Sequence, residues 1–201
     1  AHILAEGGYE HLSVSPDGRF LAGLALSRGS DGYPRDKARL DAQYHGLHLI
    51  DLETGTVSAA APGLDIQSAG VSWSANGAKL AFFAVQPGET RAQGQHHVLD
   101  VAQGDVMAVP HSGLDLVSER ERGLLQRPER AYLLQQGLAV FARPHEENDP
   151  GAAGFTYRDI APSDLGRPDW YLLSPGQRPQ NLSGGLAPVS PLPARIGVNT
   201  L

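Results

Sequence analysis

The sequence feature that most constrains this chain is a short turn that ends in glycine and recurs at a nearly constant spacing. Residues 15–18 read Ser-Pro-Asp-Gly between two apolar runs, and residues 74–77 read Ser-Ala-Asn-Gly in the same setting. A third, degraded copy ends at Gly137, so the glycines at 18, 77 and 137 lie 59 and 60 residues apart. Proline presets φ in such a turn, Asp or Asn bonds to nearby backbone, and glycine tolerates positive φ. The predicted turn residues of this structural repeat are Asp17, Gly18, Asn76, Gly77 and Gly137.

Each repeat also contains a second hairpin. The pairs Asp51/Gly55 and Asp100/Gly104 mark equivalent turns in the first two repeats, and residues 169–182 supply a third version. Two consecutive hairpins make four antiparallel strands, which is the composition of one blade of a β-propeller. We therefore predict an all-β fold, a partial β-propeller of about three four-stranded antiparallel blades plus a stub.

The whole chain, residues 1–201, is predicted to be a single partial propeller. Its blades span residues 8–62, 66–112 and 129–184, and residues 185–201 would begin a further blade. Propellers have typically 4–8 blades, so three blades and a stub do not close a ring. We expect a fragment, or a chain that another chain completes, with self-association through the open blade ends.

Composition narrows the classes of partner. The net charge of −6 and the pI near 5.7 argue against a nucleic-acid partner, which requires a basic stripe. The longest apolar run is far below the roughly 20 residues that span a bilayer, so no membrane span is expected. Residues 1–6 lack the basic and apolar segments of a signal peptide, which leaves the cytoplasm and the periplasm both open. The absence of cysteine excludes disulfides and thiolate chemistry.

The repeats differ most between their second and third strands. Polar insertions are found there at residues 27–41, 86–93 and 143–167. Equivalent loops of a propeller emerge on the same face, so one face of the molecule is expected to carry all three insertions.

At these residues the chain resembles the blades of TolB-like propellers. It resembles equally the N-terminal propeller of prolyl oligopeptidase-family serine peptidases, which include dipeptidyl and acylaminoacyl peptidases. Residues 15–22 (Ser-Pro-Asp-Gly-Arg-Phe-Leu-Ala) and 49–55 (Leu-Ile-Asp-Leu-Glu-Thr-Gly) carry the resemblance, which covers most of residues 8–185. The features that favour the peptidases are residues 155–159, 169–173 and 179–183.

The resemblance implies a non-catalytic role for this chain. Members of the peptidase family carry a C-terminal α/β-hydrolase domain whose serine lies in a Gly-x-Ser-x-Gly motif. This sequence lacks that motif; in residues 70–74 a serine stands where the second glycine belongs, so no catalytic residue is carried over. The implied function is to gate or bind peptide substrates for a hydrolase domain absent from this chain. The alternatives are a TolB-like protein-binding scaffold and a propeller with an enzymatic or sugar-binding site in its channel.

Three residues of the third insertion are candidate substrate ligands. Dipeptidyl peptidases of this family hold the substrate's N-terminal ammonium with paired glutamates, a role that Glu146 and Glu147 would fill here. Arg158 would present its guanidinium to a substrate carbonyl or carboxylate. The structural alternatives are an exposed acidic loop for the glutamates and an ion pair between Arg158 and Asp159.

The histidines do not suggest a metal site. His96 and His97 are adjacent, and His45 and His48 are three residues apart, so in a strand each pair projects to opposite faces. Such pairs do not bind one ion together. We therefore predict surface or half-buried histidines, with no metal and no cofactor.

Overall fold

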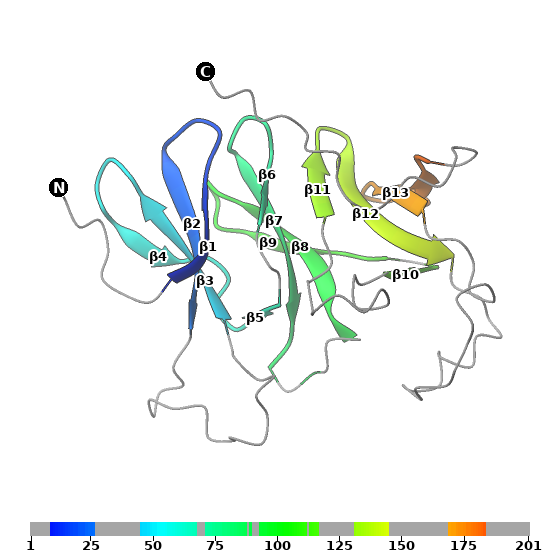
Figure 1. Ribbon diagram of the computed structural model, residues 1–201, viewed down its shortest axis with the longest axis horizontal. Helices are drawn as coiled ribbons and strands as arrows, with labels where there is room; N and C mark the ends of the chain where they lie inside the picture. The colour runs from blue at the N-terminus through cyan, green and yellow to red at the C-terminus, as the bar shows by residue number, and fades with distance from the viewer. Residues whose placement is uncertain are drawn as a thin grey trace.

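The computed structural model describes residues 9–26, 45–67, 71–87, 89, 93–111, 113–116, 131–144 and 169–183. Its elements are fourteen β-strands in three antiparallel sheets, which stand side by side like the blades of a fan (Figure 1). The predicted all-β, partial propeller fold is confirmed. The predicted stub at residues 185–201 lies outside the described residues.

Blade 1 is a four-stranded sheet in chain order, β1-β2-β3-β4. Its strands are β1 (Tyr9–Val14), β2 (Phe20–Leu26), β3 (His45–Asp51) and β4 (Val57–Ala59). The pairing of β1 with β2 shifts register between Glu10 and Ser13, where His11 adopts a φ of 52°. A β-bulge of this kind interrupts the strand at its middle.

Blade 2 has the same order with a divided first strand. Its strands are β5 (Asp65–Ile66), β6 (Ser72–Trp73), β7 (Lys79–Val85), β8 (Gln95–Asp100) and β9 (Val106–Val109). Both β5 and β6 pair with β7, β5 at its end and β6 near its start. Two short strands thus share the position that β1 fills alone in blade 1.

Blade 3 repeats the divided arrangement. Its strands are β10 (Leu114–Leu116), β11 (Ala131–Leu134), β12 (Gly137–Pro144), β13 (Asp169–Leu173) and β14 (Gln180–Asn181). Both β10 and β11 pair with β12, followed by β13 and β14. The first strand of every blade is therefore interrupted near its middle.

The pairing register defines the repeat more closely than the glycines do. One position of the second long strand is equivalent in all three blades and is occupied by Ala22, Ala81 and Ala139. Ala22 pairs with Ser13 and Leu49 of the neighbouring strands, Ala81 pairs with Ser72 and Val98, and Ala139 pairs with Tyr132 and Leu172. The structural period is therefore 59 residues from Ala22 to Ala81 and 58 residues from Ala81 to Ala139.

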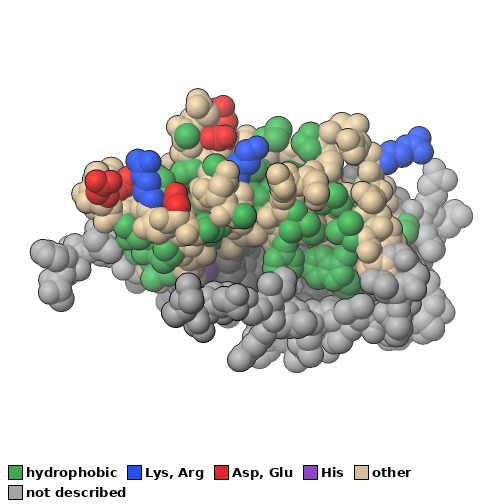
Figure 2. Space-filling view, turned by 90° about the horizontal axis from the view of Figure 1, so that it is seen from above, with side chains coloured by type: hydrophobic (Ala, Val, Ile, Leu, Met, Phe, Trp, Pro, Cys, Tyr) green, Lys and Arg blue, Asp and Glu red, His purple; other side chains and the backbone are tan. Residues whose placement is uncertain are grey.

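The apolar core lies between the blades. One cluster joins blade 1 to blade 2, and a second joins blade 2 to blade 3. Strand β7 serves both, since Leu80 and Phe82 belong to the first cluster and Ala81 to the second. Viewed from the end that carries the hairpin turns, charged side chains are scattered around hydrophobic patches (Figure 2).

The outer faces of the end blades are well covered at several positions. By strand alternation, Ile50 of blade 1 and Ala139 and Leu172 of blade 3 point away from blade 2. They expose only 2%, 6% and 8% of their surface. Self-association through the blade ends stays a prediction.

In the part of the chain that the structure describes, no helix has the length and apolar character needed to cross a membrane.

Candidate functional site

The predicted substrate ligands Glu146, Glu147 and Arg158 lie outside the described residues. The strands that border the insertions nevertheless show a common arrangement. The ends of β2, β7 and β12 and the starts of β3, β8 and β13 lie opposite the hairpin turns (Figure 1). Within the described residues, the features that carry chemistry are the repeated turns, a group of buried histidines and the exposed side chains of the sheet edges.

The inner turn of blade 1 is held by a serine at its start. The backbone N–H of Gly18 donates to the carbonyl of Ser15 (2.8 Å), and the Ser15 hydroxyl accepts from the Phe20 N–H (2.9 Å). The same hydroxyl donates to Asp17, which also accepts from the Arg19 N–H. The Ser15 hydroxyl and then the Arg19 backbone N–H hold the pKa of Asp17 below its usual value.

Blade 2 forms this turn with the same contacts. The Ser74 hydroxyl donates to Asn76 Oδ1 (2.9 Å) and accepts from the Lys79 N–H (2.9 Å), and Gly77 donates to the Ser74 carbonyl (2.9 Å). Gly18 and Gly77 have φ values of 73° and 71°, which side chains rarely tolerate. Asp17 and Asn76 thus occupy equivalent positions in two identical turns.

Gly137 has a different place in its blade. It is the first residue of β12 and pairs with Leu134, so the turn of blade 3 contains two residues, Gln135 and Gln136. The corresponding turns of blades 1 and 2 contain five residues each, 15–19 and 74–78. A Cβ at Gly137 would lie 2.2 Å from the carbonyl oxygen of Leu173. Close approach of the β13 backbone therefore requires glycine at this position.

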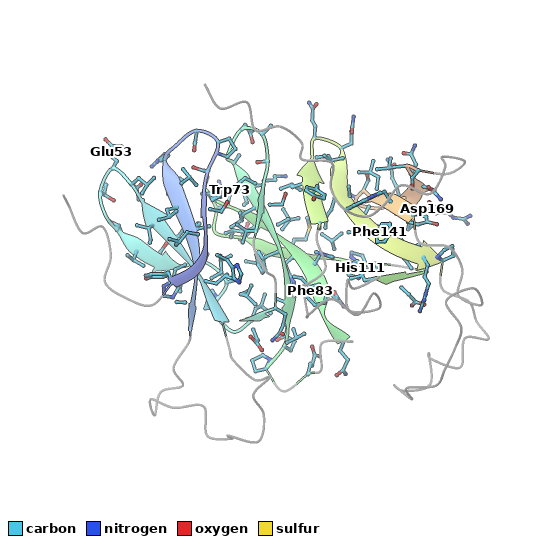
Figure 3. All side chains as sticks on the ribbon, in the orientation of Figure 1. Glu53, Trp73, Phe83, His111, Phe141 and Asp169 are labelled. Atoms are coloured by element: carbon cyan, nitrogen blue, oxygen red, sulfur yellow. The ribbon has the colours of Figure 1, made fainter. Side chains whose placement is uncertain are left out.

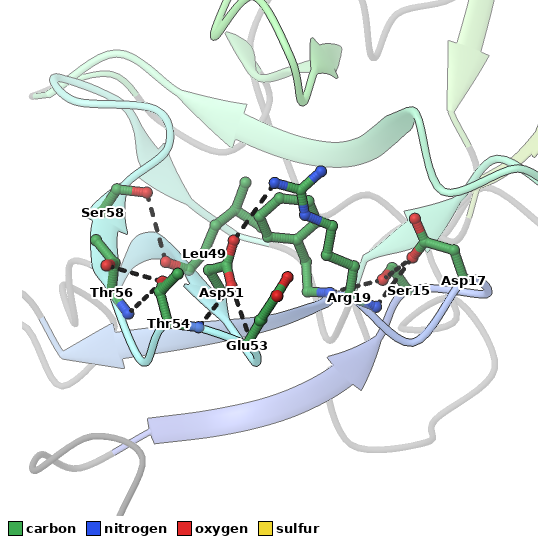
Figure 4. A network of polar contacts seen from close by, with 10 residues as sticks. Ser15, Asp17, Arg19, Leu49, Asp51, Glu53, Thr54, Thr56 and Ser58 are labelled. Atoms are coloured by element: carbon green, nitrogen blue, oxygen red, sulfur yellow. Dashed lines mark hydrogen bonds and ion pairs between the residues drawn. The ribbon is translucent and has the colours of Figure 1, made fainter.

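The outer turns repeat a second set of bonds around an aspartate. Asp51 Oδ1 accepts from the N–H groups of Glu53 (2.9 Å) and Thr54 (3.0 Å), as Figure 4 shows for blade 1. The Thr54 backbone N–H is the largest cause that holds the pKa of Asp51 below its usual value. Asp100 of blade 2 accepts two equivalent bonds from Ala102 and Gln103, both at 3.1 Å.

A hydrogen bond joins the inner and outer turns of each blade. In blade 1 the N–H of Leu52 donates to the carbonyl of Arg19 (2.8 Å), and in blade 2 the N–H of Val101 donates to that of Ala78 (3.0 Å). In blade 3 the hydroxyl of Ser174 donates to the carbonyl of Gln136 (2.8 Å) instead. In each blade, hydrogen bonds therefore join the two turns to each other, and these bonds fix the register of the strands.

The adjacent histidines of β8 project to opposite faces of blade 2, as strand alternation requires. The His96 ring meets Phe83 edge-on at 5.2 Å, and the His97 ring stacks on Phe82 at 5.6 Å. They expose only 1% and 8% of their surface, so the prediction of surface or half-buried residues is wrong for this pair. Neighbouring blades cover both faces of β8, and the sequence of the strand does not show this covering.

A third histidine completes what we call the blade 2 histidine cluster, His96, His97 and His111. The His111 ring follows β9, and its Nε2 lies 3.0 Å from His96 Nδ1 and 3.4 Å from the His96 backbone nitrogen. The tautomers of the two rings set which nitrogen donates in the ring-to-ring hydrogen bond. Burial and then the nearby His97 lower the pKa of His111 to about 4, and burial lowers that of His97.

Among the residues that the structure describes, no group of three or more His, Cys, Asp or Glu side chains could hold a metal ion. The hydrogen bonds of the histidine rings to other described residues join them to histidine, to Tyr9 and to the Gln95 carbonyl.

The sheet edges expose large apolar side chains. Within the described residues, Leu12 (57%) and Val14 (55%) lie on β1, and Leu134 (43%) lies on β11, all on the first strand of a blade. The other exposed large apolar residues lie on or beside last strands: Val57, Met107 and Leu182. Sequence reasoning missed these residues and His111, because alternation does not distinguish an edge strand from a central one.

The first strands of successive blades lie close together. The indole N–H of Trp73 on β6 donates to the carbonyl of Ser13 on β1 (3.4 Å). The backbone N–H of Leu133 on β11 donates to the hydroxyl of Ser72 on β6 (2.9 Å). The exposed residues of β1 and β11 therefore belong to one common edge of the molecule, which we call the inner edge.

No protein-family model matches this chain, and no match was found among curated proteins. Solved structures of low sequence identity are similar to it. TolB from Acinetobacter baumannii is 15% identical with a TM-score of 0.48, over 88% of this chain and 32% of that chain. A putative TolB from Agrobacterium tumefaciens is 14% identical with a TM-score of 0.44, over 89% of this chain and 50% of that chain.

The tricorn protease is 14% identical with a TM-score of 0.43, and the match covers 85% of this chain and 18% of that chain. The chain therefore spans about a third of the length of the Acinetobacter TolB and less of the tricorn protease. The assignment as a partial β-propeller rests on the three blades themselves, and the activity of any longer protein is a matter for proposal.

Proposed function

We propose that this chain is a non-catalytic propeller that binds peptide substrates and gates their access to a hydrolase domain absent from the chain. The observation that carries this proposal is the apolar inner edge. Leu12 and Val14 expose more than half of their surface there, although most large apolar residues described are buried. Exposed apolar side chains along a strand edge are typical of binding surfaces.

The inner edge also offers backbone groups to a ligand. Among the described strands, β1 pairs with β2 alone, so it is the edge strand of its sheet in this part of the chain. An extended peptide binds such an edge by adding a strand, with side chains in apolar contacts at alternate positions. Burial of a large apolar side chain contributes about 1.5–3 kcal/mol, so Leu12 and Val14 together would contribute about 3–6 kcal/mol, which corresponds to a Kd between millimolar and tens of micromolar.

The association with a hydrolase rests on the sequence resemblance to prolyl oligopeptidase-family propellers. The lack of a Gly-x-Ser-x-Gly motif in the 201 residues agrees with a non-catalytic part. In this proposal Glu146 and Glu147 hold the peptide's N-terminal ammonium, and Arg158 binds a carbonyl or carboxylate. These roles follow from residue type and resemblance.

Peptide titration tests the proposal. Fluorescein-labelled unstructured peptides with several large apolar residues are titrated with the chain, and fluorescence anisotropy is measured. We expect the L12D/V14D double variant to bind at least tenfold more weakly, since both apolar contacts are replaced by charge. The matched control is V57D, a change at another exposed valine (40%) on the last strand of the same blade, which should bind as wild type. Equal binding by the double variant would contradict the proposal.

The non-catalytic part of the proposal has its own test. A serine-directed fluorophosphonate probe is incubated with the native chain and with heat-denatured chain. We expect equal, background labelling of both samples. Labelling that depends on the native fold would show a serine nucleophile in this chain.

A TolB-like protein-binding scaffold is the second candidate. The exposed Val57 and Met107 on the last strands of blades 1 and 2 favour it, because these strands offer apolar side chains to a folded partner. If V57D and M107D abolish capture of a folded partner while unstructured peptides do not bind, the scaffold function is favoured over peptide gating.

A further inference from the structure

Blades 1 and 3 each turn one sheet face away from blade 2. Residues that pair directly across antiparallel strands project to the same face, so the pairing register assigns each side chain to a face. Among the six exposed large apolar residues of the described chain, five lie on these two faces. We call the surfaces the blade 1 end face, with Leu12, Val14 and Val57, and the blade 3 end face, with Leu134 and Leu182.

A glycine in β2 makes room for Leu12 on the blade 1 end face. A Cβ at Gly23 would project from this face and lie 3.0 Å from Leu12 Cδ2 and 3.0 Å from Tyr9 Cδ1. The register places Phe82 at the corresponding position of blade 2, where it packs against blade 1. Leu12 thus supplies apolar surface at the place where blade 2 uses a phenylalanine.

The exposed valines of blade 1 have covered counterparts in the next blades. The register aligns Val57 with Val106 of blade 2. It aligns Val14 with Trp73 of blade 2 and Leu133 of blade 3. All three counterparts are half-buried and pack against the apolar clusters that join the blades. In blades 2 and 3, a preceding blade therefore covers the surface that blade 1 exposes.

The blade 3 end face is uncovered in the same way. Phe141 occupies the position of Leu24 in blade 1 and Phe83 in blade 2. Leu24 and Phe83 face a following blade and expose 1% and 2% of their surface, whereas Phe141 is half-buried. Figure 3 shows Phe83 in the middle blade and Phe141 in the end blade. The half-buried Trp170 ring lies 5.3 Å from Phe141 and 5.5 Å from Tyr132, so this face is aromatic.

We propose that the blade 3 end face of one copy packs on the blade 1 end face of a second copy, and that two such contacts close a six-bladed ring, three blades from each chain. A second copy carries both complementary faces, one aromatic and one aliphatic. Each contact repeats the face-to-face packing that already joins the blades within the chain. A closed ring covers all four end faces and removes their apolar side chains from water. Six blades fall within the typical range of about 4–8.

The ring is compatible with peptide binding at the inner edge and independent of it. Blades pack face to face, so the unpaired edge of β1 stays open in the ring. Trp73 and Leu133, the counterparts of Val14, are only half-buried beside a neighbouring blade, so apolar surface remains at this edge. Aspartate at Val57 should break the ring and leave peptide binding unchanged. The two proposals therefore fail separately.

Sedimentation velocity of the 201-residue chain tests the ring. We expect a species of twice the 21.3 kDa of one chain. V57D alters the blade 1 end face and L182D the blade 3 end face. Each should raise the dissociation constant of the dimer by roughly 100-fold or more, because both contacts then bury an unpaired carboxylate. The matched control is M107D, whose methionine is 55% exposed on blade 2, and it should dimerise as wild type.

A mixture of the two variants distinguishes this head-to-tail ring from other dimers. In a mixed pair, one contact joins two unchanged faces, so V57D with L182D should dimerise more strongly than either variant alone. A variant that loses the native circular dichroism is replaced by V57K or L182K. Four results would overturn the ring: a wild-type monomer at about 0.1 mM chain, a dimer weakened by only one of the two variants, a mixture no stronger than its components, or assemblies larger than two copies.

Discussion

Gly18 and Gly77 end two turns of the same conformation but meet different surroundings. Their φ values are 73° and 71°. A Cβ added at Gly18 would meet nothing within 4 Å, whereas one at Gly77 would lie 3.0 Å from the carboxyl group of Asp17 in the neighbouring blade. Gly18 therefore requires glycine for its positive φ alone, whereas Gly77 requires it both for its positive φ and for the space between the blades.

Alanine substitutions at these glycines should show this difference. G18A should lower the free energy of unfolding by about 1–2 kcal/mol, the cost of a left-handed alanine. G77A should lower it further, because Asp17 must move. Urea unfolding measures both. In a D17A background the two substitutions should become equally costly, and a persistent difference would show that the contact between the blades is not the cause.

The sequence identifies these residues for a clear physical reason. Few residue types form a tight turn with positive φ, so Asp17, Gly18, Asn76 and Gly77 are readable from local chemistry alone. Gly137 shares only the spacing of the repeat with Gly18 and Gly77, because the turn of its blade is shorter. The contact between His96 and His111 is not readable from the sequence, because it joins β8 to the segment that follows β9 and because the burial of these residues depends on a neighbouring blade.

Among the elements, β6 connects its neighbours through a serine side chain. The Ser72 hydroxyl accepts from the Leu133 N–H of β11, whereas Ser13, at the equivalent position of β1, accepts through its backbone carbonyl. Replacing Ser72 therefore removes a contact between blades, and replacing Ser13 leaves the corresponding contact in place.

Alanine at Ser72 should lower the free energy of unfolding by about 1–2 kcal/mol, because the Leu133 N–H loses its acceptor in a half-buried site. Alanine at Ser13 should change it by less than about 0.5 kcal/mol. Denaturant unfolding of both variants checks this pair. Equal effects would mean that the position itself, and not the hydrogen bond, is important.

Strand β12 depends on glycine at its first residue. G137A should destabilise the fold by more than about 2 kcal/mol, because the backbone carbonyl of Leu173 blocks the new methyl group and cannot move without breaking the β12–β13 ladder. The control is G176A, a positive-φ glycine with nothing within 4 Å, which should lose only about 1–2 kcal/mol. Thermal unfolding distinguishes them, and similar losses would argue against the close approach.

The long strands were predictable, and the short ones were not. The apolar runs of β2, β7 and β12 and the turns beside them predict hairpins with little ambiguity. Strands such as β5 and β10 contain two and three residues, too few for a periodic pattern. They form because β7 and β12 present unpaired backbone at that position, which is a property of the assembled sheet.

At the scale of the whole molecule, blade 2 holds the other two blades together. Phe82 belongs to the cluster with blade 1, while Phe83 lies on the face toward blade 3, and each exposes 2% of its surface. Adjacent residues of one strand therefore stabilise different interfaces.

F82A and F83A should each lower the free energy of unfolding by about 3–5 kcal/mol, the usual range for a buried phenylalanine. Their local effects should differ. Hydrogen exchange should show lost protection in β2 and β3 for F82A and in β12 and β13 for F83A. The same pattern in both variants would contradict the assignment of the two rings to separate interfaces.

The partial propeller could be predicted because each blade repeats a local pattern of two hairpins. The stacking of the blades could not, since a run such as Leu80–Phe83 is compatible with burial by any apolar neighbour. The predicted substrate residues stand apart from both cases, because their placement depends on a long insertion whose sequence contains no periodic apolar pattern.

In most strands the alternation of apolar and polar residues specifies the pairing register, but a strand that is apolar on both faces lacks this alternation. If β7 slipped by one residue, Leu80, Phe82 and Ala84 would exchange places with Ala81, Phe83 and Val85, and no apolar side chain would become exposed. The correct alignment must therefore come from elsewhere, and the turn bonds of Ser74 and the bond from Val101 to Ala78 provide it. Blades 1 and 3 both pack against β7. The polar contacts at its turn therefore set the register of β7 and, through it, the position of both neighbouring blades.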